Sequence, residues 1–116
     1  MNIQDLSFAD VKEAVYSTIT NYSYRDRVAK IGIFGSFARG EATNDSDLDF
    51  VIDFQYQHDN TPSEVIAEVE RQFQLEEMLQ KAFAPTELSI VMMEALPTGS
   101  DFKSQVEKDV VWVYGQ

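Results

Sequence analysis

The spacing of apolar residues divides the chain into helical and extended segments. Near the N-terminus, Val11, Val15 and Ile19 recur every four residues, which predicts a helix over 8–22. Ser7 and Asp10 form a capping-box pattern at its start. Apolar runs bounded by polar or glycine-containing segments predict the other elements: strands at 28–34, about 47–54 and 87–92, helices at 62–80 and from residue 100, and a terminal strand or apolar tail at 110–114.

The alternation of helices and strands predicts an α+β fold, in which a small mixed β-sheet packs against helices. At 116 residues the chain is long enough for one hydrophobic core, so we expect a single domain over 1–116. The apolar stripe of the long helix runs through Val65 and Phe73 and then shifts at Leu75. That shift predicts a bend near Gln74 or a separate turn.

The second strand divides its side chains between two faces, because alternate residues of a strand project in opposite directions. One face is wholly apolar, which predicts that it packs on the core. Asp47 and Asp49 share the other face and are expected to point into a cleft. Asp53 falls in phase with them, and we interpret it as a solvated strand end. The apolar face comprises Leu48, Phe50, Ile52 and Phe54.

Gly35 and Ser36 stand where the first strand gives way to a short helix or turn at 37–40. Glycine lacks the Cβ that would keep the backbone away from a ligand. Ser36 offers a hydroxyl and a backbone N–H at the start of a helical turn, a position that suits anions. A phosphate seat that faces two aligned carboxylates predicts metal-dependent phosphoryl or nucleotidyl transfer.

This stretch resembles the minimal nucleotidyltransferase (MNT) family, a branch of the polymerase-β-like nucleotidyltransferases. The family's pattern of Gly-Ser, ten residues and Asp-x-Asp falls on Gly35, Ser36, Asp47 and Asp49. The flanking sequences ARGE at 38–41 and SD at 46–47 also resemble those of the family. The resemblance implies a small nucleotidyltransferase fold similar to the palm of polymerase β.

The resemblance also implies a reaction. Asp47 and Asp49 would hold two Mg²⁺ ions, while Gly35 and Ser36 would seat the triphosphate of ATP. Oxygen ligands suit Mg²⁺, and a pair of such ions can clamp the attacking and leaving oxygens of a phosphoryl transfer. An acceptor hydroxyl would attack the α-phosphorus, and pyrophosphate would leave.

Two further roles are open at this point. Arg39 is a candidate for contact with phosphate, and the alternative is that it pairs with Glu41 or Asp45 to hold the loop. The family's third acid, the base for the incoming hydroxyl, aligns with Ser89. Glu87 lies two residues earlier on the same strand face, and we interpret it as the substitute catalytic acid and third metal ligand.

Composition narrows the classes of function. The net charge is −11 and the nine Lys and Arg residues are scattered, which disfavours direct binding of nucleic acid. A nucleotide that arrives with divalent cations is compatible with this charge. The absence of cysteine excludes disulfides and thiolate metal sites. Without a membrane-length apolar run or a secretory pattern, the expected location is the cytoplasm.

The resemblance finally implies a partner. Short chains similar to MNT proteins are antitoxins whose partner is a helical HEPN-domain ribonuclease, and they transfer AMP from ATP to a tyrosine of that toxin. One alternative is a catalytically weak binding module that neutralises its partner by occlusion. Another is a subunit of a small-molecule nucleotidyltransferase. The sequence leaves the oligomeric state open, whether homo-oligomer or hetero-oligomer.

Overall fold

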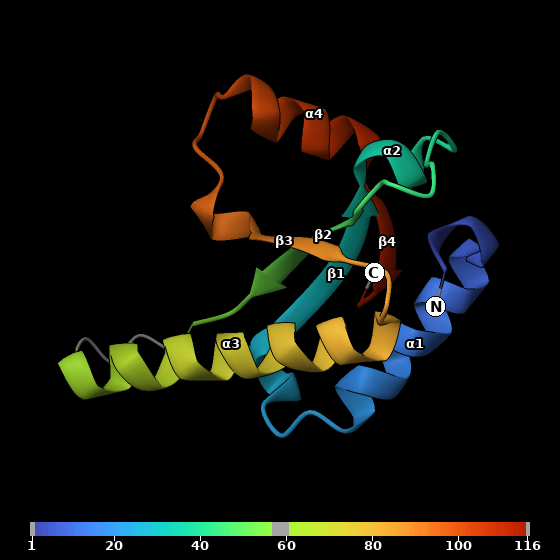
Figure 1. The fold of residues 1–116 in the computed structure, drawn as a ribbon. Helices are drawn as coiled ribbons and strands as arrows, with labels where there is room; N and C mark the ends of the chain where they lie inside the picture. Colours follow the sequence, from blue (N-terminus) through green and yellow to red (C-terminus); the bar gives the residue numbers. More distant parts are fainter. Residues whose placement is uncertain (1, 57–60, 116) are drawn as a thin grey trace.

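The computed structural model describes residues 2–56 and 61–115 and has a four-stranded mixed sheet with helices on both faces (Figure 1). The strand order is β3-β2-β1-β4, in which β1 is antiparallel to β2 and β4, and β2 is parallel to β3. This architecture confirms the predicted α+β fold class. The strands are β1 (Val28–Phe34), β2 (Leu48–Phe54), β3 (Leu88–Met92) and β4 (Val111–Tyr114).

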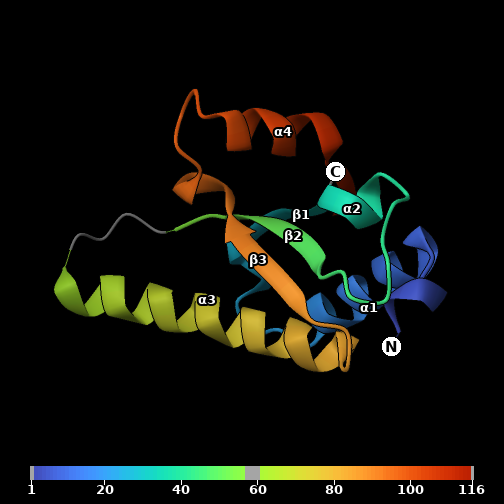
Figure 2. The same cartoon turned by 45° about the horizontal axis from the view of Figure 1, so that its top comes forward.

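Helices α1 and α3 lie under one face of the sheet and α4 lies over the other, while the short α2 follows the end of β1 (Figure 2). Helix α1 begins with the predicted capping box, because the Ser7 hydroxyl and the Asp10 carboxylate each accept a backbone N–H from the other residue. The helical segments are α1 (Phe8–Thr20), α2 (Gly35–Ala38), α3 (Pro62–Phe83), α4 (Asp101–Asp109) and the 3₁₀ turns η1 (Ile3–Asp5), η2 (Arg25–Arg27) and η3 (Met93–Ala95).

One face of β2 is buried along its whole length, and the other is buried only at its centre. Leu48, Phe50, Ile52 and Phe54 are buried in the main core with α1 and α3, as the alternation predicts. Val51, on the acidic face, is also fully buried, in a second apolar cluster with Phe34, Leu96 and Val106. The acidic face is therefore open only toward its ends, because α4 and η3 cover its centre.

Two predicted boundaries at the candidate site differ from the structure by one residue. β2 begins at Leu48, so Asp47 lies in the preceding loop rather than on the strand. β3 begins at Leu88, so Glu87 also precedes its strand. The two strands are nevertheless joined there, because the Leu48 N–H donates to the carbonyl of Glu87 at 3.0 Å.

Helix α3 is continuous from Pro62 to Phe83, so the predicted bend or separate turn near Gln74 is wrong. The C-terminal half of the helix buries Leu75, Leu79 and Phe83 against the sheet. Its N-terminal half projects past the sheet, as both ribbon views show (Figures 1 and 2). The shift of the apolar stripe marks the point where the helix leaves the core.

Another difference concerns α4. Val106 is buried as expected, whereas Phe102, which the sequence also assigns to the inner face, is 49% exposed. The Phe102 ring makes an edge contact with the ring of Phe34, at a centroid distance of 5.9 Å. No helix in residues 2–56 and 61–115 is long and apolar enough to cross a membrane.

Candidate active site

The carboxylate of Asp49 lies directly against Gly35. A Cβ placed on Gly35 would come 2.2 Å from Asp49 Oδ2, which is closer than real Cβ contacts allow. Gly35 also has a φ of 73°, a conformation that L side chains rarely adopt. The position thus requires glycine for two independent reasons. The result is that the end of β1, the start of α2 and the acidic strand β2 meet at one point.

Asp47 and Asp49 are brought close enough to interact electrostatically. Burial raises the pKa of the Asp49 carboxyl above its usual range, and the negative charge of Asp47 raises it further. Arg39 acts in the opposite direction as the smallest of the three influences. Burial and the neighbouring charge of Asp47 both disfavour the charged form of Asp49, so a bound cation would stabilise this site.

This pair fits the divalent cation that the motif implies. The candidate ligands are the carboxylate oxygens of Asp49, which is half-buried, and of Asp47, which is exposed. Because Gly35 has no Cβ, nothing on that residue obstructs the Asp49 carboxylate. Within the described residues, however, no group of three Asp, Glu or His side chains is gathered closely enough to hold a metal. The structure therefore supplies two carboxylates to the site and does not join Glu87 to them.

Ser36 follows Gly35 in the first turn of α2 and is half-buried. Its carbonyl accepts the N–H of Glu41 at 2.8 Å, which closes the turn at the C-terminal end of α2. The role of Ser36 in a phosphate seat stays a prediction.

Arg39 is paired with two carboxylates on different elements. Its Nε donates to Glu41 Oε1 at 3.0 Å, and one terminal nitrogen donates to Asp109 Oδ2 at 2.7 Å. Of the two partners expected for Arg39, Glu41 is therefore confirmed, and the ion pairs of the described residues include none with Asp45. The side chain of Asp109 is only 7% exposed. Hydrogen bonds from Gln105 and Arg39 hold the pKa of Asp109 below its usual range.

Asp109 was not identifiable from the sequence. It ends α4, far along the chain from the motif, and its neighbours Glu107 and Lys108 look like any solvated helix end. Only the placement of α4 over the sheet brings it to Arg39. The contact links α4 to α2 and thereby to the segment that carries Gly35 and Ser36.

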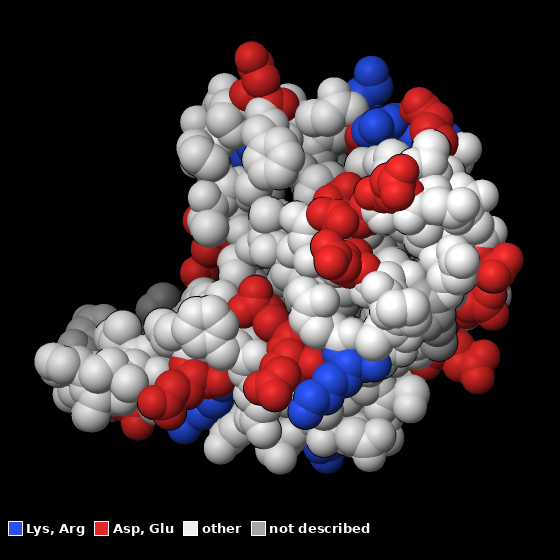
Figure 3. All heavy atoms as spheres, in the orientation of Figure 1, with Lys and Arg blue, Asp and Glu red and all other residues white. Residues whose placement is uncertain are grey.

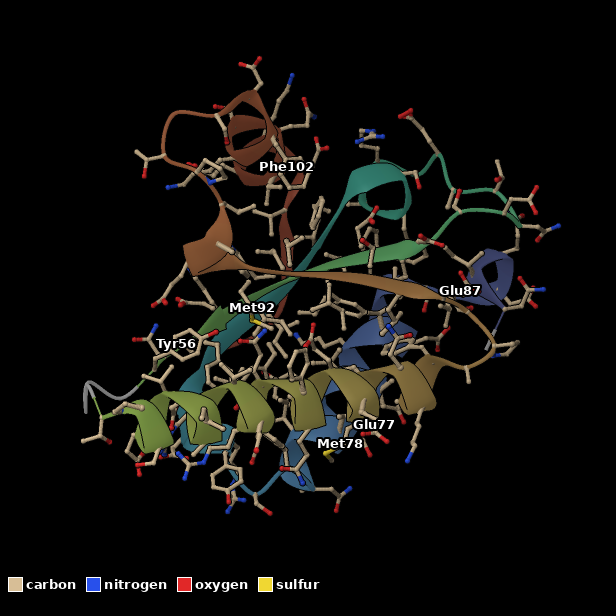
Figure 4. All side chains as sticks on the ribbon, turned by 60° about the vertical axis from the view of Figure 1, so that its left-hand side comes forward. Tyr56, Glu77, Met78, Glu87, Met92 and Phe102 are labelled. Carbon is tan, nitrogen blue, oxygen red and sulfur yellow. The ribbon has the colours of Figure 1, made fainter. Side chains whose placement is uncertain are left out.

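Ser89 lies beside Asp49 in the sheet, since the parallel register of β2 and β3 pairs these two residues. This is the place where the family resemblance aligns the third acid. Glu87 is exposed at the same end of β3, far along the strand from Met92 (Figure 4). The position next to Asp49 therefore carries the hydroxyl of Ser89, and the acid nearest to it along the chain, Glu87, is exposed just before β3.

A pocket of about 390 Å³ opens beside Asp47. Glu87 lines it too, so the two acids share one hollow even though Glu87 is not joined to the Asp47–Asp49 pair. Acidic side chains gather on this face around the ends of β2 and β3 (Figure 3). The full lining is Asn2, Ile3, Asn44, Asp45, Ser46, Asp47, Pro85, Thr86 and Glu87.

Comparison with known proteins assigns the class. The sequence matches the nucleotidyltransferase domain family over residues 18–113, so the chain belongs to that family. The predicted enzyme class, nucleotidyltransferase, is thereby confirmed. The chain is 36% identical over 86 residues to the protein adenylyltransferase MntA of Thermococcus cleftensis, an alignment that covers 74% of this chain and 75% of the relative.

Solved structures support the fold. The chain superposes with a TM-score of 0.63 and 17% identity on a crystal structure of a toxin–antitoxin with AMP-PNP, covering 90% of this chain and 73% of the other. It superposes with a TM-score of 0.58 and 15% identity on a toxin–antitoxin MntA–HpeT mutant, covering 96% and 75%. At these identities the likeness establishes the nucleotidyltransferase fold and no more.

Proposed function

We propose that this protein transfers AMP from ATP to a hydroxyl of a partner protein, and that it serves as the antitoxin of a toxin–antitoxin pair. The observation that carries the proposal is the contact of Asp49 with Gly35 beside Asp47, at the end of β2. The relative from Thermococcus cleftensis is named a protein adenylyltransferase, and similar folds occur in toxin–antitoxin structures. The proposed acceptor is a tyrosine of a HEPN-domain toxin.

In this proposal each residue has a stated task. Asp47 and Asp49 would hold Mg²⁺, and Gly35 and Ser36 would lie against the triphosphate. Arg39, whose charge acts on Asp49, is the candidate for contact with a phosphate. Bound Mg²⁺ would neutralise charge on the phosphates. Glu87, at the rim of the pocket, accepts the proton of the incoming hydroxyl. Oxygen of that hydroxyl forms the new bond to the α-phosphorus, and the bond to pyrophosphate breaks.

The test is an intact-mass measurement. Purified protein is incubated with a HEPN-domain partner, ATP and Mg²⁺, and we expect the partner to gain one AMP, on a tyrosine when the adduct is mapped. Chelation of the divalent cation with EDTA should prevent the gain. The adduct should also be absent with Asp49→Asn. A partner that stays unmodified under all conditions, with wild-type protein folded and bound, would contradict the proposal.

A second function is favoured by one specific observation. Ser89, rather than an acid, lies beside Asp49, and the described residues hold no three-acid cluster. Loss of a general base typically lowers a rate by about 10²–10⁴-fold. A protein with so slow a reaction could still neutralise its partner by occlusion. Partner inhibition that persists in Asp49→Asn, without any adduct, is the result that would select this function.

A further inference from the structure

The N-terminal half of α3 carries an apolar surface that no other part of residues 2–56 and 61–115 covers. Ile66 is 60% exposed and Phe73 is 62% exposed, and Val65 and Val69 are also exposed. Residues three and four apart on a helix are neighbours, so these side chains form one continuous stripe. We call it the α3 stripe (Val65, Ile66, Val69 and Phe73). Scattered exposed apolar residues are ordinary, whereas a contiguous set marks an interaction site.

The segment that presents the stripe is held firmly from its other side. Glu68 is buried and accepts hydrogen bonds from both Arg27 and Arg71. The hydroxyl of Tyr22 donates to the carbonyl of Arg71, and the guanidinium of Arg71 lies over the ring of Tyr24. These contacts attach the projecting half of α3 to the segment that carries Tyr22, Tyr24 and Arg27. The projecting half of α3 is thus oriented so that the stripe faces outward.

Carboxylates border the stripe along one edge. Glu70 follows Ile66 by one turn, and Glu77 follows Phe73 by one turn; both are exposed. Glu77 projects from the side of α3 away from β3 (Figure 4). Its ion pair with Lys81, at 3.4 Å between two well-exposed side chains, contributes little. The projecting end of α3 is otherwise largely white, with acidic side chains beneath it (Figure 3).

Glu76 adds a second acidic feature near the C-terminal end of the stripe. Its Oε2 is buried and has no hydrogen-bond partner in the described structure. Burial raises the pKa of this carboxyl, which Gln72 partly offsets by a hydrogen bond. Because this oxygen is buried, Glu76 is not part of the exposed acidic edge, which Glu70 and Glu77 form. Together these features favour a partner surface that is apolar at its centre and basic at its edge.

A second copy of this chain is a poor occupant. Two copies would bring together net charges of −11 each, with Glu70 and Glu77 on both sides of the contact. A stable dimer interface also buries roughly 800 Å² on each partner, more than four partly exposed side chains supply. A stripe on a single helix is instead the size that one amphipathic helix covers when it packs along another.

We propose that the α3 stripe is the docking site for an amphipathic helix of a different polypeptide, whose apolar residues pack on the stripe and whose Lys or Arg residues face Glu70 and Glu77. The proposal rests on the proposed function only in expecting a helical protein partner. In both ribbon views the projecting end of α3 lies at the opposite side of the molecule from α2 (Figures 1 and 2). A partner docked there leaves the transfer site open to an acceptor side chain.

The test uses a synthetic helical peptide as the probe. An 18-residue peptide with leucine on one face and lysine at the flanking positions is titrated against the full chain by fluorescence anisotropy at physiological salt. We expect the Ile66→Gln/Phe73→Gln double variant to bind at least tenfold more weakly. Glutamine is a good helix former, so α3 should persist, as circular dichroism would verify. The matched control Val111→Thr, an exposed apolar residue on β4, should bind like wild type.

A charge-reversal arm tests the other half of the proposal. Glu70→Lys/Glu77→Lys should lose the lysine peptide and gain a peptide of the same pattern with glutamate flanks. Glu107→Lys, an exposed acid on α4, is the matched control and should retain the original preference. Equal binding of both peptides to wild type and to Glu70→Lys/Glu77→Lys would overturn the charge argument.

Two outcomes would overturn the docking site itself. One is equal affinity of the lysine peptide for wild type and for Ile66→Gln/Phe73→Gln. The other is a wild-type dimer in sedimentation experiments that the double variant disperses, which would make a second copy the occupant. Peptide discrimination with no AMP transfer would refute only the proposed function. AMP transfer without peptide discrimination would refute only this inference.

Discussion

β2 and β3 run parallel and begin at the same end of the sheet, yet they place different side chains there. β2 brings Asp49, half-buried, against the backbone of Gly35 and within the electrostatic influence of Asp47. β3 brings Ser89 into register beside Asp49 and leaves Glu87 exposed just before the strand. The start of β2 therefore has two neighbouring acids, one on the strand and one just before it, whereas the start of β3 has a serine on the strand and an exposed glutamate just before it.

The difference separates two kinds of requirement. A cation binds well where neighbouring carboxylates repel each other in its absence. The start of β2 has that arrangement, because Asp49 is half-buried and lies near the charge of Asp47. Removing a proton from an acceptor needs a base at the reacting atoms, and β3 has no acid at the position nearest Asp49. The difference between the two strands predicts a protein that binds metal and nucleotide well but transfers AMP slowly.

The largest expected effect concerns Asp49. Asp49→Asn removes a charge from the buried side of the acidic pair, and we expect AMP transfer to fall on the order of 10³-fold, the scale for loss of a preorganised electrostatic contact. Intact mass of the partner over time measures the rate. Asp53→Asn is the matched control, because Asp53 lies on the same strand face as Asp49 and its carboxylate accepts a hydrogen bond from Gln55. Equal losses in both variants would break the distinction drawn for β2.

The contrast between the strands also explains what the sequence could and could not predict. The motif of Gly35, Ser36, Asp47 and Asp49 is local, because a short connection joins β1 to β2 and the antiparallel pairing of these two strands brings Asp49 beside the end of β1. Helix caps and the apolar face of β2 are local in the same sense. The predicted starts of β2 and β3 are one residue too early, so Asp47 and Glu87 lie just before their strands rather than on them.

Contacts between segments that are distant in the chain could not be predicted from the sequence. The Arg39–Asp109 ion pair depends on how α4 lies over the sheet, and nothing near Asp109 signals it. The exposed stripe on α3 escaped for a related reason: Val65 and Phe73 look like core residues until the length of the sheet beneath them is known. Apolar spacing reports which residues share a face, and tertiary packing decides what covers that face.

The next effect in size concerns Glu87. If it is the base, Glu87→Gln should lower kcat about 10²-fold, within the range of general-base catalysis, while the KM for ATP changes little. Glu94→Gln, an exposed acid at η3, serves as the control. Unchanged kcat in Glu87→Gln would mean that β3 contributes no acid to the reaction.

Ser89→Asp addresses the same question from the other direction. The substitution adds a carboxylate beside Asp49 in the sheet register, so we expect it to raise kcat about tenfold and to restore activity to Glu87→Gln. The added charge should also make the protein more dependent on divalent cation, measured as a larger rise in Tm on addition of Mg²⁺. Ser89→Asn is the control, since it adds a similar volume without charge. A gain shared by both variants would show that charge is not the missing feature.

The smallest expected effect lies where α4 meets α2. Asp109 is nearly buried and holds Arg39, which leaves that arginine with Glu41 as its other partner. Asp109→Asn keeps an acceptor but removes the charge, so the end of β1 and β2 should stay folded while Arg39 is held less firmly. We expect the KM for ATP to change about threefold and kcat to stay within about twofold. Glu41→Gln, which removes the charge of the more exposed partner of the same arginine, should have a still smaller effect, because exposed ion pairs contribute little. A larger effect from Glu41→Gln than from Asp109→Asn would mean that the loop, rather than α4, positions Arg39 beside the acidic pair.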